Sequence, residues 1–418
     1  MAKKTTKKAV ALRVPRIVSA AVQLGGKMST KTIRLPITNV YMDGDYTGTI
    51  YVGGKKKPVN VILDTGSSSL AIDGTFYDVT KDKTAQLTDI AQEVGYADGS
   101  SWVGAIVLTD VTAGLGSQSV DLPKVSVAVA YHEARNVFGN SNGILGLAYT
   151  KLNDAYVMPG LTLPPRYTYN EIQAGKVTYI DPYFTQLETA GLVANKFSFY
   201  TLRSEVSMAT ANPATDPLNH GFLILGGGEE NTDLYTGSFQ VARVLDDLYY
   251  NTNLKSITVG NTAPIPVSPP TKASGNTSNS VIDSGTNSIL LDQHLFDAVT
   301  EKLSSIDETL ADELRAGYAP MSKLDLSAWP PITFTLEGAL GVDVNLVVTP
   351  DTYWQTNSPK AGRATSSLFG DDGQGGGQSI LGLPLMNNYF TVFDRSVDRG
   401  RGVVSFAKIN PQINSKKK

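Results

Sequence analysis

The chain has 418 residues, of which 41% are hydrophobic and 18% charged, so it can bury a large core and has the length of two domains. It contains no cysteine, which excludes disulfides, thiol nucleophiles and cysteine-ligated metal centres. Residues 1–42 contain nine Lys and Arg and no acid, and three lysines end the chain, which leaves 24 bases against 39 acids between these basic ends. No apolar run approaches the roughly 20 residues of a membrane helix, so we expect no membrane span.

The patterns along the chain predict an all-β protein with a few short helices. Residues 1–32 show no sustained period and are predicted to be a tail. Apolar segments separated by turn residues then predict a β meander, with strands over 33–41, 46–52, 59–64, 92–96, 103–111 and 124–131. Helices are predicted at 182–190 and at 292–303, the second capped by Asp292. Polar or Gly/Pro-rich stretches predict surface loops at 204–219, 264–280 and 366–379.

The chain repeats one motif at long range. Residues 61–67 (VILDTGS) are matched by residues 280–286 (SVIDSGT), each with apolar residues followed by Asp, a hydroxyl residue, Gly and a second hydroxyl residue. Each copy is followed by an apolar-apolar-Gly element, at 144–146 and at 380–382. Two copies with matching partners indicate a duplicated lobe.

This repeat has a chemical consequence. A strand that ends in Asp-Ser/Thr-Gly places a carboxylate at a turn, where Gly lets another backbone come close. Two such carboxylates about 3 Å apart repel by about 5 kcal/mol at an effective dielectric of 20, so the pair holds one proton over a wide acidic range. One carboxylate can then activate a water while the other protonates an amide oxygen. The neighbouring hydroxyls can hold the pair by hydrogen bonds, and they belong to Thr65, Ser67, Ser284 and Thr286.

These motifs resemble those of the pepsin-like aspartic peptidases, over about residues 33–409. Residues 95–100 (GYADGS), followed by Gly104, are similar to the family's flap, the hairpin that closes over bound peptide. Further landmarks lie at 36–39, 45–50, 143–149, 223–227, 235–238 and 380–395. The resemblance implies a bilobal fold with two pseudo-twofold-related β lobes and a cleft between them. We place the lobes at 33–203 and 204–412, with basic ends at 1–32 and 413–418.

The resemblance also implies roles for particular residues. Asp64 and Asp283 would form the catalytic dyad, and Tyr96 would be the flap residue that folds over the substrate. The complete predicted substrate-binding set is Ile62, Gly66, Tyr96, Asp98, Gly99, Ile144, Gly285 and Thr286. The implied activity is aspartic endopeptidase cleavage of peptides or unfolded proteins, with an acidic optimum and hydrophobic residues at the cut.

The chain departs from the family pattern at three positions. Ala71 stands where the family commonly has a Trp that is hydrogen-bonded to the flap Tyr, and Trp102 in the flap is a candidate to compensate. Asn142 and Leu383 stand where Asp usually flanks the two Gly-containing elements. The dyad itself is intact.

Two other functions are alternatives to this prediction. Residues 139–143 (GNSNG) fit the nucleophile pattern of a serine hydrolase, with Ser141 as nucleophile and His220 and His294 later in the chain. That pattern requires an apolar strand leading into a helix, whereas residues 140–142 form a polar turn. A pepsin fold without catalysis could instead serve as a binding or inhibitor protein, although both Asp residues are present.

Partners and location follow from the same features. The three histidines lack ligand spacing, so we predict no metal and no other cofactor. We expect a monomer that binds no nucleic acid. Arg13, Pro15 and Arg16 interrupt the apolar stretch that a secretion signal would need, which predicts a cytoplasmic, prokaryotic-type enzyme. The alternative is a protein secreted by a route not visible in the sequence, with residues 1–32 as a reduced prosegment whose lysines lie against the acidic cleft.

Overall fold

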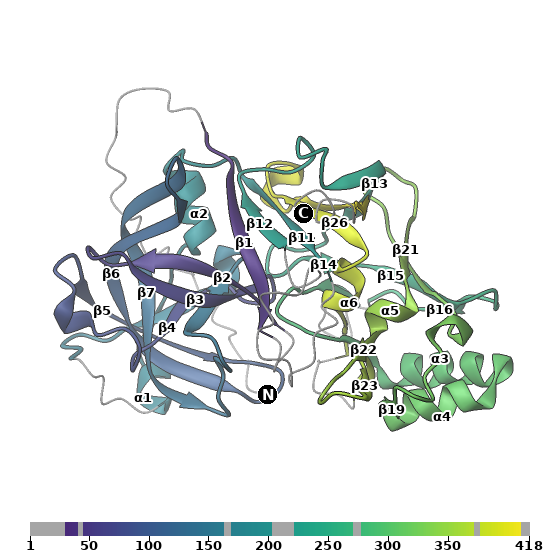
Figure 1. Ribbon diagram of the computed structural model, residues 1–418. Coiled ribbons are helices and arrows are strands. Elements are labelled where there is room, and N and C mark those ends of the chain that lie inside the picture. The colour runs from purple at the N-terminus through teal and green to yellow at the C-terminus, as the bar shows by residue number, and fades with distance from the viewer. Residues whose placement is uncertain are drawn as a thin grey trace, which may run out of the picture.

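The computed structural model describes residues 30–40, 45–162, 169–202, 221–270, 277–371 and 377–410. Nearly all of the predicted basic ends, the loop at 204–219 and the predicted lobe boundary after residue 203 lie outside these ranges. The N-terminal and C-terminal halves of the chain form two bodies side by side (Figure 1). They are joined by strands β1 (Ile33–Val40), β12 (Gly221–Leu225), β11 (Lys196–Thr201) and β26 (Tyr389–Asp394). None of the helices in the described ranges is long and apolar enough to cross a membrane.

One sheet of 15 strands runs through the N-terminal half and continues across the junction. Its members, in spatial order, are β10 (Lys176–Tyr179), β9 (Asp154–Val157), β5 (Gln86–Gly95), β6 (Ser101–Leu115), β7 (Gln118–Ala134), β4 (Leu70–Asp73), β8 (Gly143–Gly146), β3 (Lys57–Asp64), β2 (Asp45–Val52), β1 (Ile33–Val40), β12 (Gly221–Leu225), β11 (Lys196–Thr201), β26 (Tyr389–Asp394), β27 (Val403–Ile409) and β13 (Tyr235–Arg243). The predicted strands are confirmed, because each of them overlaps β1, β2, β3, β5, β6 or β7. The predicted meander is only partly confirmed, because β4 and β8 lie between the runs β1–β2–β3 and β5–β6–β7.

The C-terminal half contains three smaller sheets. The first contains, in spatial order, β14 (Asn251–Thr252), β17 (Ser280–Ile282), β25 (Ser379–Leu381), β18 (Ile289–Asp292) and β24 (Leu368–Asp371). The second contains β16 (Ile265–Pro266), β15 (Leu254–Val259), β20 (Ile332–Leu336) and β21 (Val344–Val348). The third contains β19 (Tyr318–Pro320), β23 (Arg363–Ser366) and β22 (Trp354–Thr356). The helices are α1 (Tyr169–Gln173), α2 (Tyr183–Thr189), α3 (Gln293–Ile306), α4 (Glu308–Ala316), α5 (Pro350–Tyr353) and α6 (Leu383–Met386).

The sequence repeat is also a repeat of strand pairing. In the first copy β3 pairs parallel with β8, which pairs antiparallel with β4, which pairs parallel with β7. The second copy has the same three pairings in β17, β25, β18 and β24. In both copies the strand that leads into the Asp therefore pairs with one edge of the strand that carries the apolar-apolar-Gly element. The loop after the Asp leads into a strand that pairs with the other edge of that same strand. The duplicated β architecture predicted from the motif is confirmed.

The predicted helices are confirmed, and two of the predicted loops are partly wrong. Helix α2 falls within 182–190, and α3 begins after Asp292, whose side chain accepts a hydrogen bond from the backbone of His294. Residues 366–379 were predicted to be a loop, but they contain β24 and the first residue of β25. Leu368 is fully buried there and pairs with Ile289, so tertiary packing overrides the glycine-rich local composition. The short strand β16 likewise interrupts the predicted loop at 264–280.

Candidate active site

The two Asp loops are bonded to each other through their hydroxyl residues. The backbone N–H of Thr65 donates to Oγ of Ser284 at 3.0 Å, and the N–H of Ser284 donates to Oγ1 of Thr65 at 2.8 Å. Each hydroxyl in turn donates to a carbonyl of the opposite strand, Thr65 to Ile282 at 3.1 Å and Ser284 to Leu63 at 2.7 Å. Thr65 and Ser284 are both fully buried. These reciprocal bonds hold the ends of β3 and β17 in a fixed, nearly symmetric arrangement.

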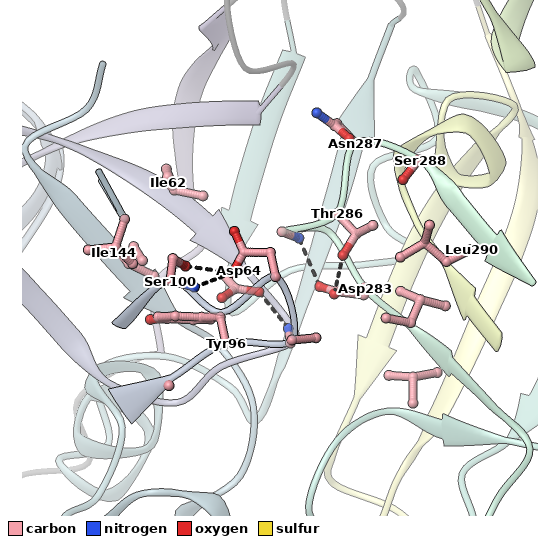
Figure 2. Close-up of a pocket in the computed structure, with 18 of the residues that line it drawn as sticks. Ile62, Asp64, Tyr96, Ser100, Ile144, Asp283, Thr286, Asn287, Ser288 and Leu290 are labelled. Atoms are coloured by element: carbon pink, nitrogen blue, oxygen red, sulfur yellow. Dashed lines mark hydrogen bonds between the residues drawn. The ribbon is translucent and has the colours of Figure 1, made fainter. Parts of the chain in front are cut away.

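This arrangement brings Asp64 and Asp283 together. Figure 2 shows the two carboxylates facing each other from the two halves of the molecule. A β-carbon at Gly66 would lie 2.6 Å from Oδ1 of Asp283, and one at Gly285 would lie 2.2 Å from Oδ1 of Asp64. Each glycine also donates its backbone N–H to the Asp of its own loop, at 2.7 Å in the first and 2.9 Å in the second. A side chain at either position would collide with the opposite carboxylate unless that carboxylate moved.

The surroundings of the Asp64 carboxyl disfavour its charged form. Asp64 is 6% exposed, and burial, followed by the charge of Asp283, raises the pKa of its carboxyl well above the ordinary value. The buried hydroxyl of Ser67 makes no well-aligned hydrogen bond with a described residue, yet it lies close enough to lower this pKa in part. On the other side, Oγ1 of Thr286 donates to Oδ2 of Asp283 at 2.6 Å. Since the carboxylates are neighbours, their protons belong to the pair rather than to either residue.

Tyr96 lies over Asp64 on the hairpin between β5 and β6. Its hydroxyl accepts a hydrogen bond from Nε1 of Trp102 at 3.2 Å, and burial and the charge of Asp64 raise its pKa. Trp102 is 1% exposed and belongs to the same apolar cluster as Ala71. The small side chain of Ala71 leaves room in that cluster, and the indole on the hairpin supplies the bond to the tyrosine. The hairpin tip is closed by Asp98, whose Oδ1 accepts from the backbone and the hydroxyl of Ser100 at 2.8 and 2.7 Å.

A cavity of about 800 Å³ opens around the two carboxylates and under the hairpin. Ile62 and Ile144 line its N-terminal side, while Leu290 lines the opposite side (Figure 2). Of the predicted substrate-binding set, Gly99 does not line the cavity and instead packs under the guanidinium of Arg135. The lining residues that the sequence prediction missed are Gly95, Ala97, Ser100, Arg135, Asn136, Val137, Gly139, Tyr249, Val281, Asn287, Ser288, Leu290, Gln378 and Ile380. Gly95, Ala97 and Ser100 belong to the flap motif, and Val281 and Ile380 belong to the repeated motif and its partner element, so the sequence already marked their segments. Arg135, Tyr249 and Gln378 lie in none of these motifs, and only the assembled fold brings them to the cleft.

The serine alternative finds no geometric support in the described part of the chain. The hydroxyl of Ser141 donates to the carbonyls of Phe138 and Gly143, at 2.6 and 3.0 Å. His294 is paired with Asp292 at the start of α3, and His220 lies outside the described residues. Within the described ranges, no group of three or more His, Asp or Glu side chains could hold a metal ion.

Comparison with known proteins agrees with this geometry. The family model described as "Eukaryotic aspartyl protease" matches residues 45–409. The chain is 26% identical to chymosin of Callithrix jacchus over 375 residues, which cover 86% of this chain and 80% of chymosin. It is 25% identical to cathepsin D of Chionodraco hamatus over 386 residues, which cover 88% of this chain and 82% of cathepsin D. It is also 24% identical to pepsin B of Canis lupus familiaris over 382 residues, which cover 87% and 82% of the two chains. Because the family model spans most of the sequence, the chain belongs to the eukaryotic aspartyl protease family and is an aspartic-type endopeptidase with the predicted pepsin-like fold.

Proposed function

We propose that Asp64 and Asp283 carry the hydrolysis, with a water held between their carboxylates as the nucleophile. The ionised carboxylate takes a proton from this water as its oxygen attacks the peptide carbonyl, and the protonated carboxyl donates to the carbonyl oxygen. When the C–N bond of the tetrahedral intermediate breaks, the carboxyl that took the proton of the water donates it to the leaving nitrogen, and the other carboxylate takes back a proton from the intermediate as the new carboxyl group forms. Because water is the nucleophile, no covalent enzyme intermediate forms. The observation that supports this proposal is the opposition of the two carboxylates, each against the glycine of the other loop.

The proposed mechanism requires one proton on the pair, which favours an acidic optimum. At high pH both carboxylates are ionised and no acid remains to protonate the carbonyl oxygen. The raised pKa of Asp64 supports a proton that stays on the pair to higher pH than on an ordinary aspartate, with activity lost once the pair gives up that proton. The rate of peptide cleavage as a function of pH tests this, and a rate that keeps rising into the alkaline range would contradict it.

The proposed substrate is a peptide or unfolded protein, bound extended under the hairpin with an apolar residue at the cut. Ile62 and Ile144 are neighbours in the β3–β8 pairing, and both line the cavity beside Tyr96. Burying an apolar side chain against them gains about 25 cal/mol per Å². A peptide library should therefore be cut beside Leu, Phe or similar residues, whereas a preference for charged residues at the cut would contradict the proposal.

The catalytic proposal is tested by Asp64→Asn and Asp283→Asn, assayed on a denatured protein. Each amide removes the shared proton and should reduce cleavage to below a few percent, with the fold retained. Asp312→Asn, on the exposed face of α4, is the matched control and should cleave normally. A pepstatin-like transition-state mimic should inhibit the unmodified protein. Substantial activity in either dyad variant would overturn the assignment, and activity that resists the mimic would point to a different nucleophile.

A further inference from the structure

One wall of the cleft carries a positive charge that the proposed mechanism does not use. Arg135 and Asn136 follow β7 and line the cavity, with φ values of 56° and 53°. Non-glycine residues rarely adopt this left-handed conformation, and two in succession persist only where the surroundings hold them. Such backbone outliers concentrate at sites that contact ligands. The turn presents both side chains to the cleft.

The guanidinium of Arg135 lies against the tip of the hairpin. Its Nη1 donates to the backbone carbonyl of Asp98 at 2.5 Å. A β-carbon at Gly99 would lie 2.6 Å from Nη1 and 2.9 Å from Cζ, so the absence of a side chain at Gly99 leaves room for the guanidinium. A guanidinium has five N–H donors in a planar fork, and this bond uses one of them. Donors therefore remain for a ligand in the cleft.

The charge of Arg135 is not neutralised by an ion pair within the described ranges. Its guanidinium forms no salt bridge to any described carboxylate, and its side chain is exposed. Among the described residues that line the cavity it is the only base, and the acids there are Asp64, Asp98 and Asp283. The Asp98 carboxylate is turned back onto Ser100 instead. An anionic group of a substrate would thus find one complementary charge in this cleft.

We propose that Arg135 forms an acid-binding subsite that accepts an Asp or Glu side chain of the substrate, a proposal that rests on the peptidase function proposed above. Val137, two residues after Arg135, packs against the apolar cluster that contains Ile62 and Ile144. The wall therefore runs from the apolar subsite to the guanidinium. Alternate side chains of an extended peptide face the same way. We place the acidic residue at the nearest position on the same face of the peptide, two residues from the apolar residue held by Ile62 and Ile144.

The test compares two peptides that differ only in Glu or Gln at that position, at about pH 5, where a substrate Glu is mostly ionised. The ratio of kcat/KM for Glu over Gln should be about two- to fivefold in the unmodified protein, as for an exposed ion pair. Arg135→Gln should bring the ratio to about one, while Arg135→Lys should retain part of the preference. Arg315→Gln removes an arginine on α4 that pairs with Asp312 and should leave the ratio unchanged.

The ratio separates charge recognition from any loosening of the hairpin, because loosening lowers kcat/KM for both peptides alike. Equal cleavage of the two peptides by the unmodified protein would overturn the subsite and leave the peptidase function intact. A preference for Glu that survives in Arg135→Gln would assign the selectivity to another residue and would also overturn it. If the unmodified protein cleaves neither peptide nor a denatured protein, the proposed function itself fails.

Discussion

Replacing Thr65 by Val tests whether the bonds between the two Asp loops stabilise the fold. The substitution keeps the shape of the side chain and removes only its hydroxyl, which accepts from the N–H of Ser284 and donates to the carbonyl of Ile282. Thr65 is fully buried, so water cannot replace the lost partner without rearrangement. Two polar groups from the other half of the molecule would be left unsatisfied.

The size of the effect follows from these two groups. A buried donor or acceptor that loses its partner costs about 1 to 3 kcal/mol, so the two together should lower the free energy of unfolding by roughly 2 to 6 kcal/mol. No cavity term is added, because Val fills the volume of Thr. A loss of this size is a large fraction of the roughly 5 to 15 kcal/mol by which proteins are stable.

Urea unfolding, followed by the fluorescence of the tryptophans, measures this change. Thr49→Val is the matched control, since Thr49 is exposed on β2 and its substitution should alter the free energy of unfolding by less than about 0.5 kcal/mol. If Thr65→Val is no more destabilising than Thr49→Val, the reciprocal bonds do not stabilise the junction and the argument from their burial is refuted.

Three further predictions concern the cleft. Trp102→Phe keeps the apolar contact and removes the donor to the Tyr96 hydroxyl, so steady-state kinetics should show kcat/KM several-fold lower; unchanged kinetics would show that the bond does not position the hairpin. Gly285→Ala places a β-carbon on the Asp64 carboxylate and should abolish cleavage with the protein still folded by circular dichroism, whereas retained activity would contradict the close approach. The folded state binds the Asp64 proton more tightly than the unfolded chain does, so stability should fall as pH rises from the ordinary aspartate pKa of 3.8 through the raised one. Thermal melting at several pH values should show this slope, and an equal slope in Asp64→Asn would exclude Asp64 as its source.

The sequence predicted the parts of the fold that local patterns encode. The apolar strand before each Asp and the Gly-containing partner strand predicted the duplicated pairing, which β3 with β8 and β17 with β25 confirm. The sheet across the junction could not be predicted in this way. It pairs β1 with β12 and β11 with β26, and partners such as Lys196 and Asp394 are far apart in the sequence. Such pairings depend on the assembled fold rather than on local propensity.

Helix α4 was missed although its signals are present. Asp307 caps it by accepting from the backbone of Thr309, and Gly317 ends it with φ of 71°. Leu310 and Leu314 lie on its buried face, at the spacing of one helical turn. Helix α4 follows α3 after a single residue, so in the sequence the start of α4 is hard to distinguish from the end of α3.

The two copies of the motif share the same pattern of residue types, yet their surroundings differ in a way that matters for the proposed chemistry. Ser67 and Thr286 occupy equivalent positions, but only the Thr286 hydroxyl makes a well-aligned bond to its Asp among the described residues. The hairpin with Tyr96 covers Asp64, which is more deeply buried than Asp283. One hairpin can close over only one side of a symmetric pair, so the shared proton experiences unequal surroundings. In the proposed mechanism this inequality favours one carboxyl as the acid and the other as the base, and it arises from the tertiary placement of the hairpin rather than from either copy of the motif.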